Sequence, residues 1–181
     1  MNYSLSLPVL NLTRGVRMKK LVFVLSSILL FASVAVAKDK LVSQWNCGKP
    51  TEAHSIDVGD QPNHSYAVSK GTCTSLKGEV GGVREKEGGG PQFNETTGDT
   101  TQWHGVFIVT MANGDKLHYT YANKGPGIMK NGQFQSGTNK WSIVGGTGKF
   151  ANAKGEGTCQ GKGNADGSAT WDCEGNYTLT K

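Results

Sequence analysis

Acid–base or metal chemistry would need histidines and carboxylates that converge, and the chain has four histidines: His54, His64, His104 and His118. The first two fall in predicted loops, whereas His104 and His118 flank Asn113-Gly114, a strong short hairpin signal. A hairpin loop with an odd number of residues would put both on one face, and an even number would put them on opposite faces. Because a satisfied or exposed histidine is the commoner case, no catalytic residue is predicted here.

Four carboxylates surround the glycine-rich segment 88–91, which is predicted to be a loop: Glu85, Glu87, Glu95 and Asp99. Such a loop can border a cavity, but charged side chains usually stay in water, so a solvated loop is favoured. Arg84 is the only arginine after residue 37. It could bind a carboxylate of a ligand or pair with a neighbouring glutamate at the surface. No Gly-x-Ser-x-Gly elbow or Ser-His-Asp order indicates a nucleophile.

A leader segment opens the chain. Met18-Lys19-Lys20 is a cationic start, residues 21–31 are almost entirely apolar, and Ala35-Val36-Ala37 ends the run with small residues. These are the three parts of a secretory signal, so we expect cleavage after Ala37, with residues 1–17 as a mis-assigned start. A membrane anchor is the alternative, but the stretch from residue 21 to residue 37 is only about 17 residues long, which is short for a bilayer.

The net charge of +5 arises mostly in this leader, which holds four basic residues and no acid: Arg14, Arg17, Lys19 and Lys20. Without it, 15 basic residues face 14 acidic ones. A nearly neutral domain lacks the charge that binds phosphate backbones, which excludes a nucleic-acid partner. The prediction is one domain over residues 38–181, exported to the periplasm or secreted, with no membrane attachment after cleavage.

All four cysteines follow the leader: Cys47, Cys73, Cys159 and Cys173. An even number in a small exported domain favours disulfides over thiols. Asn164-Ala165-Asp166-Gly167 is a turn sequence, and a hairpin folded about it places Cys159 opposite Cys173. The remaining pair is then Cys47 and Cys73. A zinc site is the weaker alternative, because Cys-x-x-Cys and His-x-x-x-His spacings do not occur, so no metal is expected.

The glycine-rich segment 142–150 resembles two nucleotide-binding motifs, and neither holds. A Walker P-loop would need glycine at Ile143 and serine or threonine at Phe150. The spacing Gly146-x-Gly148-x-x-Ala151 fits a relaxed dinucleotide fingerprint, but no helix of adequate length follows it. No cofactor is therefore predicted.

The elements that position any site must be strands, because no long 3.6-residue apolar period follows the leader. Residues 101–112 alternate with apolar side chains on both faces, and residues 117–121 alternate after the hairpin signal. Other strands are predicted at 40–46, 65–74, 133–136, 140–144, 157–162 and 168–180, with a weaker one at 78–87 and loops at 88–91 and 124–127. Short strands with glycine at their interiors and corners favour a closed barrel over a sandwich.

One segment is more specific than this strand pattern. Residues 144–157 read Val-Gly-Gly-Thr-Gly-Lys-Phe-Ala-Asn-Ala-Lys-Gly-Glu-Gly and resemble the strand–turn–strand signature of the allene oxide cyclase and dirigent barrels. The resemblance implies an all-β, eight-stranded antiparallel calycin-like barrel with an interior cavity, often assembled as a homotrimer. Phe150 would point inward as a plug. No catalytic residue is carried over, because residues 41–100 show no motif of the plant cyclases.

An eight-stranded barrel either fills its interior with side chains or holds one small ligand. The predicted cavity lining is Trp103, Phe107, Tyr119, Tyr121, Trp141, Phe150 and Arg84. We therefore predict an exported, non-enzymatic barrel that binds a small apolar or amphipathic molecule. The alternatives are an isomerase or cyclase, by analogy with the resembled family, and an interaction module with a packed interior that associates through the 101–121 hairpin.

Overall fold

The computed structural model describes residues 38–180, so the predicted leader lies outside the described residues. In this range no helix is long and apolar enough to cross a bilayer. Eight long strands are present: β1 Asp39–Cys47, β3 His64–Lys77, β5 Val83–Thr97, β6 Thr100–Met111, β7 Lys116–Asn123, β9 Gln133–Gly146, β10 Lys154–Gly163 and β11 Ala169–Thr178. The shorter elements are β2 Glu52–Asp57, β4 Glu79–Val80, β8 Gly127–Lys130 and the 3-10 turn η2 Gly148–Phe150.

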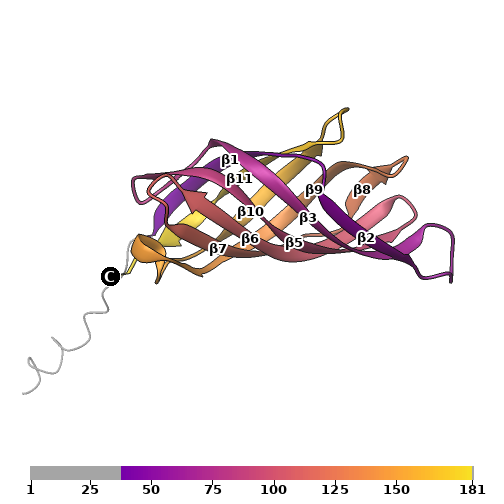
Figure 1. The fold of residues 1–181 in the computed structure, drawn as a ribbon, viewed down its shortest axis with the longest axis horizontal. Helices are drawn as coiled ribbons and strands as arrows, with labels where there is room; N and C mark the ends of the chain where they lie inside the picture. Colours follow the sequence, from indigo (N-terminus) through magenta and orange to yellow (C-terminus); the bar gives the residue numbers. More distant parts are fainter. Residues whose placement is uncertain (1–37, 181) are drawn as a thin grey trace, which may run out of the picture. The chain divides into compact units, whose positions relative to one another are not determined.

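The eight long strands form a closed antiparallel barrel (Figure 1). Each pairs with the next in the order β1, β3, β5, β6, β7, β9, β10 and β11, and β11 pairs back with β1. β2 lies beyond β1 along the same edge of β3, and β8 lies beyond β7 between β6 and β9. The predicted all-β barrel is confirmed, and closure gives the sheet an inner and an outer face.

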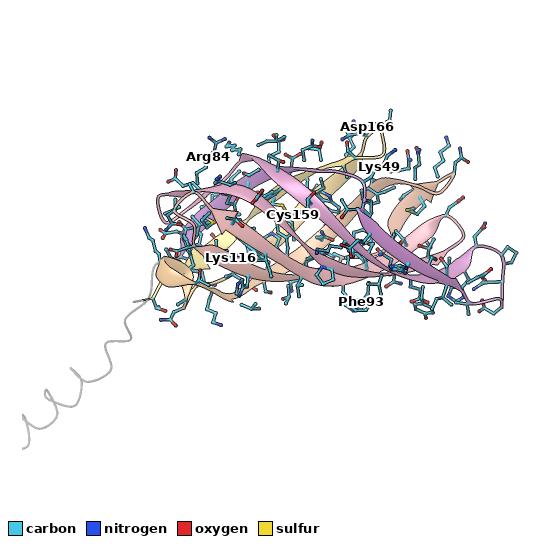
Figure 2. All side chains as sticks on the ribbon, in the orientation of Figure 1. Lys49, Arg84, Phe93, Lys116, Cys159 and Asp166 are labelled. Carbon is cyan, nitrogen blue, oxygen red and sulfur yellow. A yellow bond between two sulfur atoms is a disulfide. The ribbon has the colours of Figure 1, made fainter. Side chains whose placement is uncertain are left out.

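The hairpin between β6 and β7 decides where two histidines lie. Val109 pairs with Leu117, so odd-numbered residues of β6 pair with odd-numbered residues of β7. The loop between the two strands therefore has an odd number of residues. His104 and His118 consequently share the outer face, as the odd-loop alternative requires. His104 is exposed there and stacks on Phe93 of β5, with ring centroids 5.3 Å apart. Phe93 is labelled in Figure 2. Exposed apolar side chains on this outer face, Val106 and Ile108, match the predicted two-faced hairpin, and the trimer stays a prediction.

Residues 88–91 form the middle of β5, so the loop prediction for this segment is wrong. The glycines are required by close neighbours rather than by a turn. A Cβ on Gly90 would lie 2.2 Å from the carbonyl oxygen of Val106, and one on Gly88 would lie 2.4 Å from Cζ of Phe107. Here glycine allows the strand to approach its neighbours closely.

A β-bulge at Lys86 changes which residues of β5 face inward. Glu85 pairs with Met111, and Glu87 pairs with Thr110, so the bulged strand contains one extra residue between successive pairs. Beyond the bulge the even-numbered residues face inward, whereas before it the odd-numbered Glu85 does. As a result Glu85 is only 1% exposed, while Glu87 is exposed. The expectation that all four nearby carboxylates are solvated is therefore wrong for Glu85.

Both predicted disulfides are present, Cys47–Cys73 and Cys159–Cys173. Each joins two residues that pair directly across neighbouring strands, β1 with β3 and β10 with β11. No cysteine in the described part of the chain is free. Two disulfides in a small domain are typical of proteins that work in an oxidising compartment.

One end of the barrel is packed shut. Phe150 in η2 and Val80 in β4 are both 0% exposed and belong to one hydrophobic cluster. The Gly81 N–H donates to the Tyr177 hydroxyl at 2.8 Å, and Lys149 Nζ donates to the Gly81 carbonyl. These contacts join η2, the turn after β4 and the end of β11, so Phe150 acts as part of a plug at this end.

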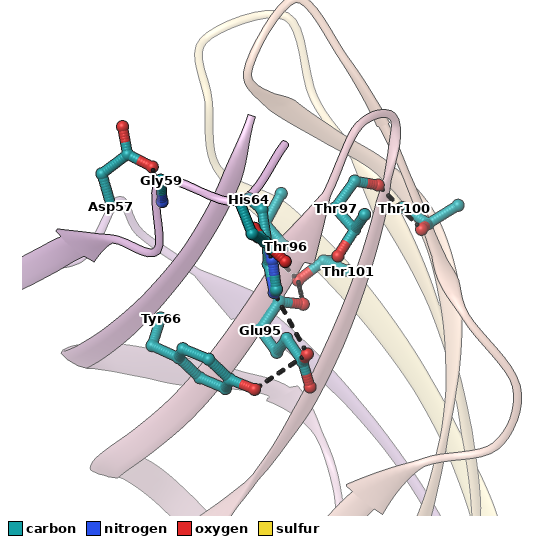
Figure 3. A network of polar contacts seen from close by, with 10 residues as sticks. Asp57, Gly59, His64, Tyr66, Glu95, Thr96, Thr97, Thr100 and Thr101 are labelled. Atoms are coloured by element: carbon teal, nitrogen blue, oxygen red, sulfur yellow. Dashed lines mark hydrogen bonds and ion pairs between the residues drawn. The ribbon is translucent and has the colours of Figure 1, made fainter. Parts of the chain in front are cut away.

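A polar cluster ties strands together near the opposite end (Figure 3). His64 Nδ1 lies 2.6 Å from Asp60 Oδ1, and its Nε2 lies 3.3 Å from Glu95 Oε1. The Tyr66 hydroxyl donates to the same Glu95 oxygen at 3.0 Å. Asp60, and after it Glu95, raises the pKa of His64, and the imidazole in turn lowers the pKa of Asp60. The cluster is therefore held most strongly when His64 is protonated.

We expect His64→Asn to reduce the loss of thermal stability at alkaline pH. Because its pKa is raised on folding, His64 contributes fully below its ordinary value of about 6.5 and loses that contribution as the pH rises through the folded-state pKa. The melting temperature of the wild type should fall more than that of His64→Asn between about pH 6 and about pH 9. His54→Asn, at an exposed position on β2, is the control. Equal falls in the wild type and His64→Asn would contradict the role assigned to this cluster.

Candidate functional site

The barrel encloses a cavity of about 840 Å³, within the size range of small-molecule sites. We call the part of this single cavity toward the closed end the inner chamber. It is bordered by side chains that are mostly buried: Leu41, Ser43, Trp45, Glu85, Phe107, Val109, Tyr119 and Trp141. The outer chamber lies toward the other end and is lined mainly by β2, β3, the second half of β5, β8 and the start of β9. The interior is therefore not filled by side chains.

Five of the seven predicted lining residues border this cavity: Trp103, Phe107, Tyr119, Tyr121 and Trp141. Phe150 does not, because it is fully buried in the plug of the closed end. Arg84 does not either, since it is exposed on the outside and pairs across a short hairpin with Glu79 (Figure 2). With Glu85 turned inward, the alternation of the strand points Arg84 outward.

Three aromatic rings form a cluster in the outer chamber. Phe134 and Trp171 stack with centroids 5.6 Å apart, and Trp103 meets both edge-on at 5.8 and 6.2 Å. The Trp103 indole N–H donates to Asn139 Oδ1 at 2.5 Å, which fixes the ring. Gly137 leaves space for Trp103, since a Cβ there would lie 2.5 Å from the indole. Rigid aromatic faces of this kind bind flat apolar groups.

The cavity wall formed by β3 and β5 carries hydrogen-bonding side chains rather than aromatic rings, and Tyr121 of β7 contacts them. The Tyr121 hydroxyl donates to Gln92 Oε1 at 2.9 Å, Gln92 Nε2 donates to Asn94 Oδ1 at 2.6 Å, and Asn94 Nδ2 donates to Ser69 Oγ at 3.1 Å. Burial raises the pKa of Tyr121 to about 12, so its hydroxyl stays protonated. These amides and hydroxyls retain capacity for further hydrogen bonds, which lets this wall orient a ligand.

Glu85 is the acidic residue of the inner chamber. The Tyr119 hydroxyl donates to its Oε1 at 3.4 Å, and its Oε2 has no hydrogen-bond partner among the described residues. Burial raises the pKa of Glu85 to about 7, although hydrogen bonding with Tyr119 and Ser43 opposes that shift. No ion pair with a basic side chain of the described chain includes it. Glu85 therefore populates both protonation states near neutral pH.

The residues around Glu85 leave space for this carboxyl group and supply it with a donor. A Cβ on Gly78 would lie 1.9 Å from Oε2 of Glu85 and 2.8 Å from Cβ of Ser43, so glycine is required there. Burial, and after it Glu85, raises the pKa of Tyr119, which stays protonated. Trp141 Nε1 is a second buried atom of this chamber without a partner among the described residues.

The predicted lining left out several side chains of this site, among them Trp45, Glu85 and Phe134. Trp45 could have been found, because it alternates with apolar Leu41 on the predicted first strand. Phe134 lay on a predicted strand, but nothing showed which of its faces would be inside. Glu85 carried no signal, because its orientation depends on a bulge that the alternation pattern does not reveal.

No family model matches the chain, and no curated protein matches it. Among solved structures, two pterocarpan synthase dirigent proteins are similar at 12% and 14% identity, with TM-scores of 0.49 and 0.45, over 80% of this chain and 93% and 97% of those chains. A pyocyanin demethylase is similar at 16% identity and a TM-score of 0.37, over 76% of this chain and 98% of that one.

The resemblance of residues 144–157 to the allene oxide cyclase and dirigent barrels stays a prediction. At these identities no residue of the cavity takes a role from the similar structures.

Proposed function

We propose that this protein is an exported barrel that binds one small ligand with a flat, apolar body in its cavity. The observation that carries this proposal is the 840 Å³ interior with the fixed aromatic cluster of Trp103, Phe134 and Trp171 beside a hydrogen-bonding wall. Burial of apolar surface would supply the affinity, and the polar wall would orient the ligand. The two disulfides support export.

Removing one ring of the aromatic cluster should weaken binding of aromatic probes. Trp103→Ala removes one large apolar face, and we expect the dissociation constant for a naphthalene-sized probe to rise about tenfold or more. Titrations monitored by tryptophan fluorescence, with native mass spectrometry of freshly purified protein, would measure this. Phe93→Ala, which removes an exposed ring on the outer face, is the matched control. The proposal fails if no member of a panel of aromatics, terpenoids and fatty acids binds the wild type.

A second candidate is an isomerase, and the observation in its favour is Glu85. A carboxyl group whose pKa is about 7 can accept and return a proton at neutral pH, and the protonated Tyr119 lies 3.4 Å away. The two candidates differ in the fate of the ligand. A binder releases it chemically unchanged, whereas an isomerase releases a rearranged product of the same mass.

A further inference from the structure

Glu85 lacks the partner that a buried carboxylate needs. Its side chain is 1% exposed, and a carboxylate taken out of water is stable only when it is paired or hydrogen-bonded throughout. One oxygen accepts from Tyr119, and the other has no partner in the described chain. Glu85 is also the only acidic residue that lines the cavity within the described range.

The groups that do face Glu85 favour its ionised form. The Tyr119 hydroxyl donates to it from β7, and hydrogen bonding with Ser43 of β1 also opposes the effect of burial. A protonated Glu85 would need an acceptor for its own hydrogen, and Oε2 has none among the described residues. The inner chamber thus contains a donor for a carboxylate, and no basic side chain of the described residues borders it.

Aromatic side chains surround the same chamber. Trp45 and Phe107 meet edge-on with centroids 5.1 Å apart, and Tyr119 and Trp141 do so at 5.7 Å. All four border the cavity. Aromatic faces attract cations through the negative charge above the ring, and this attraction strengthens where water is excluded.

We propose that the inner chamber selects organic cations, so that the ligand is an aromatic molecule with a positively charged nitrogen neutralised by Glu85. This inference rests on the proposed function, because it assigns the charge of the ligand bound in that same cavity. The nitrogen would lie between Glu85 and the surrounding rings, and the flat body would extend toward Trp103 in the outer chamber.

The basic residue at the cavity border does not oppose this assignment. Lys49 lines the outer part of the cavity beside the β10–β11 turn (Figure 2). Asp166 of that turn has its pKa lowered by hydrogen bonds from Ser168 and, to a smaller extent, by Lys49. The charge of Lys49 therefore lies in the outer part of the cavity, away from Glu85, and the carboxyl group of Asp166 is close enough to feel it.

Two probes that differ mainly in charge test the proposal. 2-Naphthylmethylammonium and 2-naphthylmethanol share the ring and the one-carbon arm. Calorimetry would measure the affinity of each at about pH 8, where Glu85 is ionised because its pKa is about 7. We expect the wild type to bind the ammonium about tenfold or more tightly than the alcohol. Glu85→Gln should bring the two affinities close together, because the variant side chain carries no negative charge. Glu87→Gln, exposed two residues away, should keep the preference.

A second measurement needs no variant, and it decides the matter if Glu85→Gln does not fold. At about pH 7, binding of the ammonium should release about half a proton per ligand, because it converts the protonated half of Glu85 to the carboxylate. Calorimetry in two buffers of different ionisation enthalpy measures this release, and the alcohol should release none.

The outcomes separate this inference from the proposed function. If the alcohol binds the wild type as tightly as the ammonium, the cation preference is overturned and the apolar cavity stands. A preference that persists in Glu85→Gln, or ammonium binding without proton release, overturns the role of Glu85. If neither probe binds, both the inference and the proposed function lose their support.

Discussion

The free energy of unfolding should fall by about 3 kcal/mol between pH 4.5 and pH 8 through Glu85 alone. Its pKa rises from an ordinary 4.5 to about 7 on folding, chiefly because of burial. Below its ordinary pKa of 4.5, such a carboxyl group is protonated in the folded and the unfolded state alike, so it does not lower the free energy of unfolding. As the pH rises from 4.5 to about 7, the group ionises in the unfolded state first and the free energy of unfolding falls. Above about pH 7 the fall is complete.

Urea unfolding of the ligand-free protein at several pH values would measure this loss. Glu85→Gln keeps the shape of the side chain and cannot ionise, so its stability should vary far less with pH. His64 contributes a loss of the same sign over part of this range, so the comparison is best made in a His64→Asn background. The same pH dependence with and without the Glu85 carboxyl group would refute its burial in the unligated protein.

Removing either disulfide should cost roughly 3 kcal/mol of stability, by the loop-closure relation. Cys159 and Cys173 are 14 residues apart and Cys47 and Cys73 are 26 apart, so loss of the second pair should cost slightly more. Together the two losses approach the total stability of an ordinary domain, about 5–15 kcal/mol. The fully reduced protein should therefore be partly unfolded at physiological temperature.

The double variants Cys159→Ala/Cys173→Ala and Cys47→Ala/Cys73→Ala separate the two contributions. Both pairs line the cavity, so ligand binding should weaken along with stability. The midpoint of urea unfolding of each variant, compared with that of the oxidised wild type, gives the loss. Losses well below about 1 kcal/mol for both pairs would show that the paired strands need no covalent link.

Much of the fold could be predicted because local chemistry determined it. The alternation in residues 101–112 and 117–121 gave the faces of β6 and β7 correctly, and the turn sequence between Cys159 and Cys173 gave their pairing. Glycine was the weak point of the prediction. In residues 88–90 it indicated a loop, whereas the structure shows a strand pressed against the backbone of its neighbours.

A site residue could be predicted where its side chain keeps to the regular inward and outward alternation of its strand, and it could not be predicted where that alternation is broken. Tyr119 and Tyr121 lie on the inner face that the pattern of β7 requires. Glu85 depends on a one-residue bulge, and the space for its carboxyl group comes from Gly78 in another part of the chain. Such an arrangement arises from tertiary packing, so no window of sequence around Glu85 contains it.

The sealed end with Phe150 and Val80 has a consequence for the timing of exchange. A ligand that reaches Glu85 can enter and leave only through the open end of the barrel. Water displaced from the inner chamber must leave through the same opening. Crowding in that shared passage slows arrival and departure together. A ligand bound as proposed should therefore dissociate slowly for its dissociation constant.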